Sequence, residues 1–399
     1  MYKQEIENLI HKCKYYQSRS EYRSFNSLNE LPIIDRNVVR DNNDQFIINK
    51  CLQNAVVKET SGTTGAIVKV VWDASDYYAS IKPIWMIRRK FGITPSDVYI
   101  TDHAWITNAS INPGIKIYID NNRISLSKIY IDDGTLMSYV NIISQSSPSW
   151  MMISPSFAIV LGMYLKKCNL VLNSIKLVEL SGEYVSDECH EYIEKLFYWT
   201  IVKSQYGMTE CNVIGYEHDY EKNVLVTVPG NIMEIVNCKG EPCLIGETGD
   251  VLVTNYSNRN MPILRYRTGD VATLLEKSNE CLKFKIESSR ESDYYTYKGI
   301  KYNSSIFYCI VQQYNNHFSD YSIDQFLFIG REKESLLAKL HLKTGFELNC
   351  ELRIKERLEK IFDSIIGSYP EITVEIVNTI PKMSKKKSYF VVDNVTAQE

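Results

Sequence analysis

The middle of the chain shows hydrophobic patterns of two different periods. Short apolar runs bounded by polar residues predict buried strands, and apolar residues repeated about every 3.6 positions predict helices. The expected elements are a strand at 150–153, a helix at 155–167, a strand at 175–180, a helix at 187–197 with Asp187 as its N-cap, and a strand at 200–202. This alternation is typical of a parallel sheet with crossover helices. A ligand site is therefore expected at the carboxyl ends of the strands.

The flanking regions follow other patterns. Before the middle region we expect an opening helix at 1–18, a strand at 67–71, a helix at 77–91 that Pro83 interrupts, and short strands between 97 and 132. After it we expect an all-β stretch at 225–275, a boundary near 288–293, a helix at 302–314, a strand at 325–330, a helix at 352–366 and a strand at 372–377. The predicted fold class is α/β. A large domain at 1–289 would hold α/β sheets and a β-rich subdomain, and a small α+β domain would follow at 290–399.

A loop of small residues separates two of the expected strands. It contains Glu59-Thr60-Ser61-Gly62-Thr63-Thr64-Gly65, in which hydroxyl side chains lie between glycines. Such a loop can bend sharply and direct N–H and O–H donors at one spot, as a polyphosphate requires. It is not a Walker P-loop, because no Gly-Lys-Ser/Thr follows it. Taken alone, the loop could also be a plain β-turn.

Three later segments change how this loop is interpreted. They are Tyr206-Gly207-Met208-Thr209-Glu210, Arg265-Tyr266-Arg267-Thr268-Gly269-Asp270 and Pro381-Lys382-Met383-Ser384-Lys385-Lys386-Lys387. In this order and spacing, the four segments resemble those of the adenylate-forming enzyme superfamily. Within it, the chain most resembles the branch of phenylacetate–coenzyme A ligases and capsule-biosynthesis ligases. The resemblance covers roughly residues 30–399 and is loose over most of 92–148.

The resemblance implies ATP-dependent activation of a carboxylic acid. Ser61, Gly62, Thr63, Thr64 and Gly65 would then surround the β- and γ-phosphates. Tyr206 would stack on adenine, and Gly207 would let the backbone approach the ligand closely. Thr209 would contact the α-phosphate, and Glu210 would hold Mg²⁺. The alternative for this segment is a core tyrosine and a carboxylate at a helix start.

Other nucleotide contacts follow from the same resemblance. Asp270 would accept bonds from both ribose hydroxyls, although a turn aspartate can also bond its own backbone. Arg290 would contact ribose or phosphate. Gly182 and Glu183 belong to Ser181-Gly182-Glu183, which resembles the segment along the adenine edge.

The C-terminal domain carries the remaining expectations, since the resemblance implies that it is mobile. Lys386 would enter the active site and bridge carboxylate and α-phosphate oxygens. The relatives have glycine before this lysine whereas this chain has Lys385, so Lys385 and Lys387 stay open as alternatives. Ser292 replaces the usual hinge carboxylate, and Gly299 fits the loop that lines a thiol tunnel after domain rotation.

Composition and charge narrow the field of alternatives. A net charge of −3 offers no basic field for nucleic acid or an anionic membrane. The ten cysteines include no Cys-x-x-Cys pair, and the longest apolar run, 157–165, is too short to span a bilayer. The N-terminal residues are polar and acidic, unlike a signal peptide. We therefore expect a soluble cytoplasmic protein, with reduced cysteines and an undetermined oligomeric state.

The expected reaction has two steps. ATP and Mg²⁺ would convert a carboxylic acid into an acyl adenylate with release of pyrophosphate, and the acyl group would then pass to a thiol. That thiol would belong to coenzyme A or to the phosphopantetheine of a carrier protein. Transfer to an amine, transfer to a protein cysteine such as Cys350, and a non-catalytic nucleotide-binding homologue remain as alternatives. The acid is open, because residues 101–110 lack the glycine-rich stretch of phenylacetate ligases.

Overall fold

The fold comes from a computed structural model, in which the chain divides into two compact units. Residues 1–95 and 203–290 make the first unit, and residues 96–202 and 291–399 make the second. The structure describes residues 2–59, 68–102, 114–128, 130–278, 281–289, 294–303, 305–318, 320–331, 334–342, 350–378, 380 and 390–392. The separate small domain predicted at 290–399 stays a prediction.

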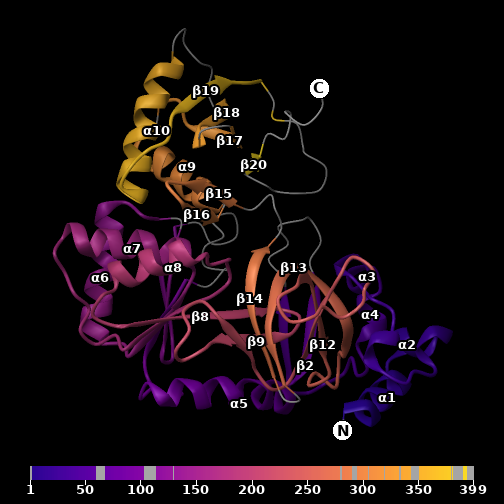
Figure 1. Cartoon of the computed structure of the whole chain (residues 1–399). Helices are drawn as coiled ribbons and strands as arrows, with labels where there is room; N and C mark the ends of the chain where they lie inside the picture. The colour runs from indigo at the N-terminus through magenta and orange to yellow at the C-terminus, as the bar shows by residue number, and fades with distance from the viewer. Residues whose placement is uncertain are drawn as a thin grey trace. The chain divides into compact units, whose positions relative to one another are not determined.

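The first unit is built on antiparallel strands that lie next to one another in the order β11-β12-β13-β14-β10-β9-β8. Figure 1 labels β8, β9, β12, β13 and β14 of this set. Their bounds are β8 (Ile201–Met208), β9 (Asn212–Glu217), β10 (Leu225–Thr227), β11 (Ile232–Val236), β12 (Thr248–Asn255), β13 (Ile263–Lys277) and β14 (Leu282–Ser289). The all-β character expected for 225–275 is confirmed. The longest strand, β13, pairs with both β12 and β14.

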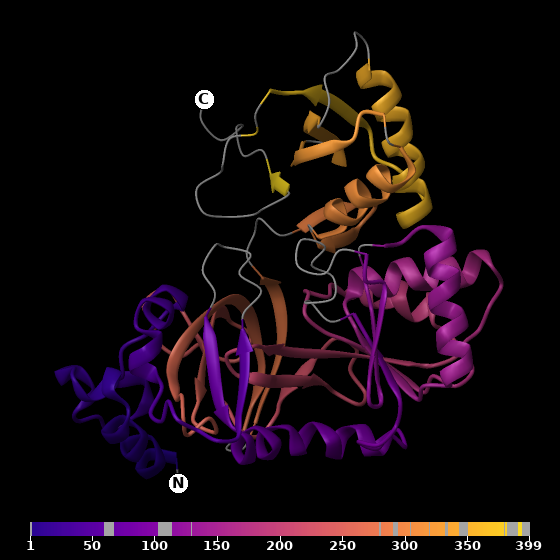
Figure 2. The ribbon, with the colours of Figure 1, turned by 180° about the vertical axis from the view of Figure 1, so that it is seen from behind.

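A second, two-stranded sheet and the N-terminal helices complete this unit. β1 (Ala55–Glu59) pairs antiparallel with β2 (Lys69–Asp73), and Figure 2 shows this pair beside the strands of the larger sheet. Val70 and Trp72 of β2 share one apolar core with Ile263 of β13. The helices are α1 (Tyr2–Lys12), α2 (Lys14–Gln17), α3 (Arg36–Asp41), α4 (Asn43–Phe46) and α5 (Ala74–Lys90). The single opening helix expected at 1–18 is thus divided, because Cys13 has extended backbone angles.

Helix α5 corrects the expected interruption at Pro83. The helix runs unbroken from Ala74 to Lys90 with the proline inside it. Asp73 caps its start by accepting a hydrogen bond from the Ser75 N–H at 2.8 Å. Just after the proline, Ile84 is buried against Tyr216 and Val228. This packing holds the helix together although proline removes one backbone donor.

The second unit contains the predicted parallel sheet, with strands ordered β7-β6-β3-β5-β4. The strands are β3 (Tyr99–Thr101), β4 (Ile117–Asp120), β5 (Arg123–Leu126), β6 (Trp150–Ile153) and β7 (Leu177–Leu180), and all pairs except β4–β5 are parallel. The crossover helices are α6 (Asp133–Ser146), α7 (Pro155–Lys167) and α8 (Asp187–Leu196). The N-cap of α8 is Ser186, not Asp187, because the Ser186 hydroxyl accepts from the Cys189 N–H at 3.2 Å.

The C-terminal stretch of this unit is α+β, as the sequence predicts. β15 (Tyr294–Tyr297) and β16 (Ile300–Asn303) form a hairpin, and a four-stranded sheet has the order β19-β18-β17-β20. Its strands are β17 (Ile323–Gly330), β18 (Leu336–Leu342), β19 (Ile372–Ile376) and β20 (Phe390–Val392), and the helices are α9 (Ser305–His317) and α10 (Cys350–Ile366). None of the helices in the described part of the chain is long and apolar enough to cross a membrane.

Candidate functional site

The hairpin between β8 and β9 carries the Tyr-Gly-Met-Thr-Glu segment. Thr209 and Glu210 lie in the turn that joins the two strands, after Met208 and before Asn212. A Cβ atom on Gly207 would lie 2.6 Å from the Asn212 carbonyl oxygen, so the hairpin itself requires glycine there. Asn212 has a positive φ of 58°, which asparagine tolerates better than most residues. The closer approach of a ligand to Gly207 stays a prediction.

Two tyrosine–carboxylate hydrogen bonds join this hairpin to β13. The Tyr206 hydroxyl donates to Oδ2 of Asp270 at 2.7 Å, and the Tyr266 hydroxyl donates to Oε1 of Glu210 at 3.1 Å. Each motif therefore contributes a tyrosine that binds the acid of the other motif. The structure thus brings Tyr206, Glu210 and Asp270 together, as the sequence predicts.

Burial keeps both tyrosines in their hydrogen-bond-donating form. Burial, followed by the charge of Asp270, raises the pKa of Tyr206 well above its ordinary value. Burial and the neighbouring Glu210 likewise raise the pKa of Tyr266. Next to Glu210, burial raises the pKa of the Cys211 thiol well above its usual value, so this cysteine stays neutral and is a poor nucleophile.

Within the described part of the chain, the Glu210 carboxylate has no basic partner. Its residue is 5% exposed, and among the described residues only the Tyr266 hydroxyl hydrogen-bonds to the side chain. No Lys or Arg in that part of the chain lies within 4.0 Å of it, nor does any group of three potential metal ligands occur there. One buried carboxylate of this kind fits Mg²⁺, which commonly takes one or two protein carboxylates together with phosphate oxygens and water.

The buried Asn255 and the partly buried Asn231 hold the turn in place, and the sequence did not identify them. The Asn255 side-chain amide donates to the Glu210 carbonyl at 3.0 Å. The Asn231 amide donates to the carbonyls of Cys211 and Val213, both at 3.0 Å. Tyr266 was also missed, although it lies inside a motif that the sequence analysis singled out. Its place within the same motif as Asp270 is the signal that could have found it.

The neighbours of the ribose-binding candidate have structural roles. The Asp270 N–H donates to the Thr268 hydroxyl at 3.0 Å, which in turn donates to the Val251 carbonyl at 3.1 Å. Arg265 is buried and pairs with Glu234 at 3.1 Å. Arg267 is half exposed and lies 3.5 Å from Asp250. These contacts fix the strand around Asp270.

Gly182 and Glu183 belong to the second unit. Gly182 is exposed and has a positive φ of 85°, a turn conformation that favours glycine. The Glu183 carboxylate accepts from Lys128 Nζ at 3.0 Å, from the Ser156 hydroxyl at 2.9 Å and from the Ser156 N–H at 3.1 Å. Its side chain therefore serves the start of α7, and the predicted contact with adenine stays a prediction.

A second buried acid lies beside this glutamate. The Asp102 carboxylate accepts from the Ser154 N–H at 3.1 Å and from the Ser154 hydroxyl, and it lies 4.0 Å from Lys128 Nζ. Burial raises the pKa of Asp102 to about 6 despite the lysine. Burial would also raise the pKa of Glu183, but Lys128 and Ser156 outweigh it, and the net change is downward. One lysine thus serves two buried carboxylates.

The other predicted site residues fall in two groups. Gly299 lies at the tip of the β15–β16 hairpin, where both Lys298 and Gly299 have positive φ, as a two-residue turn requires. Its predicted place in a thiol tunnel stays a prediction. The residues outside the described part of the chain are Ser61, Gly62, Thr63, Thr64, Gly65, Arg290, Ser292 and Lys386.

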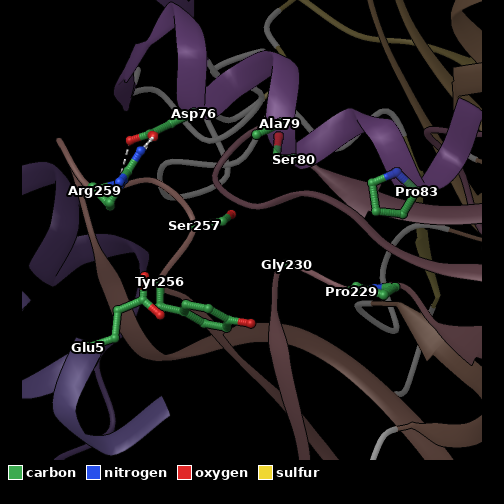
Figure 3. Close-up of a pocket in the computed structure, with 10 residues that line it drawn as sticks. All are labelled: Glu5, Asp76, Ala79, Ser80, Pro83, Pro229, Gly230, Tyr256, Ser257 and Arg259. Atoms are coloured by element: carbon green, nitrogen blue, oxygen red, sulfur yellow. Dashed lines mark hydrogen bonds and ion pairs between the residues drawn. The ribbon is translucent and has the colours of Figure 1, made fainter. Parts of the chain in front are cut away.

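A cavity of about 280 Å³ lies in the first unit, and none of the predicted site residues is part of its lining (Figure 3). Its lining consists of Glu5, Asp76, Ala79, Ser80, Pro83, Pro229, Gly230, Tyr256, Ser257 and Arg259. Figure 3 shows Arg259 paired with Asp76 at one end of it. Two lining serines contact asparagines of the turn region: Ser80 accepts from Asn212 at 2.9 Å, and Ser257 donates to Asn255 at 2.9 Å. The cavity thus adjoins the back of the turn.

Comparison with known proteins identifies the family. A family model described as AMP-binding enzyme matches residues 40–260, more than half of the chain. The chain belongs to the AMP-binding enzyme family. The predicted membership of the adenylate-forming superfamily is therefore confirmed, and with it the predicted enzyme class, an AMP-forming ligase.

Two curated relatives match this AMP-binding enzyme over most of its length. The phenylacetate–coenzyme A ligase of Escherichia coli (strain K12) is 22% identical over 393 residues, covering 92% of this chain and 85% of the relative. Protein CapK of Staphylococcus aureus is 21% identical over 385 residues, covering 92% of this chain and 81% of the relative. Both belong to the branch that the sequence motifs resemble.

Solved structures confirm the α/β fold class. A 2-hydroxyisobutyryl-CoA ligase in the postadenylation state, in complex with R3-HIB-AMP, matches with a TM-score of 0.59 and 14% identity, covering 99% of this chain and 87% of that one. The same ligase in complex with 2-HIB-AMP and CoA, in the thioesterification state, matches with a TM-score of 0.59 and 17% identity, covering 98% and 89%.

Proposed function

We propose that this AMP-binding enzyme joins a carboxylic acid to ATP, releasing pyrophosphate, and then passes the acyl group to a thiol. The observation that carries the proposal is the pair of reciprocal bonds between two motifs, Tyr206 to Asp270 and Tyr266 to Glu210. They gather in one unit an aromatic ring, an acceptor for ribose hydroxyls and a carboxylate that has no basic partner among the described residues. These are the groups that a nucleotide with a bound divalent cation requires.

In the proposed complex, the nucleoside part lies between Tyr206 and Asp270. The tyrosine ring offers a face for adenine, and such base–aromatic stacking contributes about 1–3 kcal/mol. The Tyr206 hydroxyl occupies one position on Oδ2 of Asp270, while a carboxylate has about four acceptor positions. In the proposed complex, the two ribose hydroxyls would donate to this same carboxylate. The bond from Tyr206 would orient Asp270 for them.

The first chemical step forms a bond between a carboxylate oxygen and the α-phosphorus of ATP. The bond from that phosphorus to the pyrophosphate oxygen breaks, and pyrophosphate leaves with the electron pair. Mg²⁺, when bound at Glu210, would neutralise part of the phosphate charge. Thr209, next to Glu210 in the turn, would donate its hydroxyl to an α-phosphate oxygen, and Ser61 to Gly65 would donate to the leaving phosphates. Lys386 would stabilise the charge that builds up between acid and phosphorus.

The second step transfers the acyl group from the adenylate to a thiol. The thiol sulfur attacks the acyl carbon, AMP leaves, and the thiol proton is lost to solvent or a base. The acceptor would be coenzyme A or a carrier protein's phosphopantetheine, which end in the same thiol. The names of the E. coli relative and of the solved ligase complex with CoA support a thiol acceptor. Cys350 is buried at the start of α10, which disfavours transfer to it.

Acid-dependent exchange of labelled pyrophosphate into ATP tests this proposal. We expect exchange with at least one member of a panel of aromatic, aliphatic and amino acids, and none when Mg²⁺ is removed by chelation. The variant Lys386→Ala should lose exchange while it still binds AMP. If no acid supports exchange and the protein binds neither ATP nor AMP, the proposed function is wrong.

A further inference from the structure

Lys58 connects the strand before the Ser/Thr/Gly loop to the turn that carries Glu210. It lies on β1, three residues before Ser61. Its Nζ donates to Oδ1 of Asn212 at 3.0 Å and lies 4.5 Å from the centre of the Tyr77 ring. Among the described residues, no carboxylate pairs with this ammonium group. The ammonium group of Lys58 is thus held by a hydrogen bond to an amide and by a contact with an aromatic ring.

The burial and backbone conformation of Asn212 favour this contact. Its residue is 8% exposed, and its positive φ turns the side chain out of the regular strand direction at the start of β9. While Oδ1 accepts from Lys58, Nδ2 donates to the Ser80 hydroxyl on α5 at 2.9 Å. Ser80 in turn donates to the Tyr77 carbonyl at 2.8 Å. One amide therefore joins β1, α5 and the β8–β9 turn.

We propose that Lys58 and Asn212 are positioning residues that hold the entry to the Ser/Thr/Gly loop in register with Thr209 and Glu210. This inference rests on the proposed function, in which that loop meets the β- and γ-phosphates while the turn meets the α-phosphate. ATP spans both places, whereas AMP reaches only the turn, Tyr206 and Asp270. Breaking the link should therefore weaken ATP binding much more than AMP binding.

Isothermal titration calorimetry of the full chain with Mg²⁺·ATP, and separately with AMP, measures this difference. We expect Lys58→Met and Asn212→Gly each to weaken ATP binding about tenfold, the loss expected for one hydrogen bond to a charged group, and AMP binding less than about twofold. Glycine keeps the positive φ of Asn212 and removes only its amide. Asn212→Asp retains an acceptor for Lys58 and should bind ATP within about threefold of the unaltered protein.

The double variant and two matched controls complete the test. Because both residues act through one contact, Lys58→Met combined with Asn212→Gly should cost little more than either change alone. Lys90→Met removes an exposed lysine that pairs with Asp219, and Asn121→Gly removes another asparagine of positive φ. Neither control should alter the binding of either nucleotide.

Equal losses of ATP and AMP affinity would overturn the inference, because they would indicate general damage to the unit. Unchanged ATP affinity in both variants would also overturn it, as would fully additive losses in the double variant. If the unaltered protein binds neither nucleotide, the proposed function itself fails. If it binds both and only the variants behave otherwise than expected, the proposed function stands without this link.

Discussion

A pair of buried carboxylates in the second unit and a single buried carboxylate in the first unit have opposite surroundings. In the second unit, Asp102 and Glu183 share Lys128 and receive N–H and hydroxyl donors from the start of α7. In the first unit, Glu210 receives a tyrosine hydroxyl and has no described basic partner. Buried charges are normally neutralised within the protein, because desolvation is costly. The Lys128 cluster therefore fits a structural role, whereas Glu210 fits the binding of an external cation.

The largest effect should come from removing Lys128, which lies beside both Asp102 and Glu183. Lys128→Met leaves two buried carboxylates without their cation, and we expect the free energy of unfolding to fall by about 3–5 kcal/mol. Urea denaturation followed by circular dichroism measures it. Lys167→Met is the matched control, because its pair with Asp133 is exposed and should contribute less than about 1 kcal/mol. Equal effects of the two changes would contradict a structural role for Lys128.

At Glu210 we expect the reverse, a large loss of activity with little change in stability. Glu210→Gln should lower acid-dependent pyrophosphate exchange by about 10²–10³-fold, since a group that stabilises the transferred phosphate is lost. Stability should change little, because glutamine can still accept from Tyr266. Exchange assays and thermal melting measure the two properties, with exposed Glu241→Gln as the control. If Glu210→Gln melts at a much lower temperature yet retains exchange, Glu210 has a structural role and the proposed cation-binding role is wrong.

Two substitutions of Tyr206 distinguish the role of its ring from that of its hydroxyl. Tyr206→Ala should weaken AMP binding by about 1–3 kcal/mol through lost stacking. Tyr206→Phe keeps the ring and should cost only about 1 kcal/mol, because Asp270 loses the bond that orients it. Equilibrium dialysis with labelled AMP gives both values. If phenylalanine weakens binding as much as alanine, the hydroxyl rather than the ring carries the interaction.

The smallest expected effect is a pH dependence of the protein's stability that arises from Asp102. The pKa of Asp102 is raised by burial from 3.8 in the unfolded chain to about 6, so the folded state binds the extra proton between these values. Stability must then fall as pH rises through this window. Asp102→Asn removes the dependence, and its stability relative to the unaltered protein should rise by about 1 kcal/mol between pH 5 and 7.5. Chemical denaturation at several pH values measures this.

The sign should reverse for the neighbouring glutamate. Because the pKa of Glu183 is lowered in the folded state, its contribution is present above its unfolded value and is lost as pH falls through the lowered one. Glu183→Gln should therefore lose stability relative to the unaltered protein as pH rises. Equal slopes for Asp102→Asn and Glu183→Gln would contradict the opposite roles that the geometry gives them.

The sequence predicted those parts of the fold that depend on local pattern. The bounds of β6 and α7 agree with the expected ones, because an apolar strand, a proline at the helix start and a long apolar helix follow in order. Helix α5 was misjudged at Pro83, since distant partners, Tyr216 and Val228, stabilise it. The region 97–132 offered only short candidates, and its strand order depends on pairing across the sheet.

The candidate site likewise contains residues that the sequence predicted and residues that it did not. Motif residues Tyr206, Glu210 and Asp270 could be found from the sequence, because their types and order carry the chemistry. Their partners could not. Tyr266 lies 56 residues from Glu210, and Lys128 lies 55 residues from Glu183, so only the register of strands and the placement of loops bring them together. Of the three asparagines that hold the turn, Asn212 and Asn255 are buried and Asn231 is partly buried, and none belongs to a motif of its own.

A crystal structure of the protein grown with AMP and Mg²⁺ would show whether the two motifs form one nucleotide site. We expect the adenine ring on the face of Tyr206, the ribose hydroxyls on Asp270, and the α-phosphate next to Thr209 and Glu210. A nucleotide bound elsewhere, in contact with neither Tyr206 nor Asp270, would contradict the proposed site.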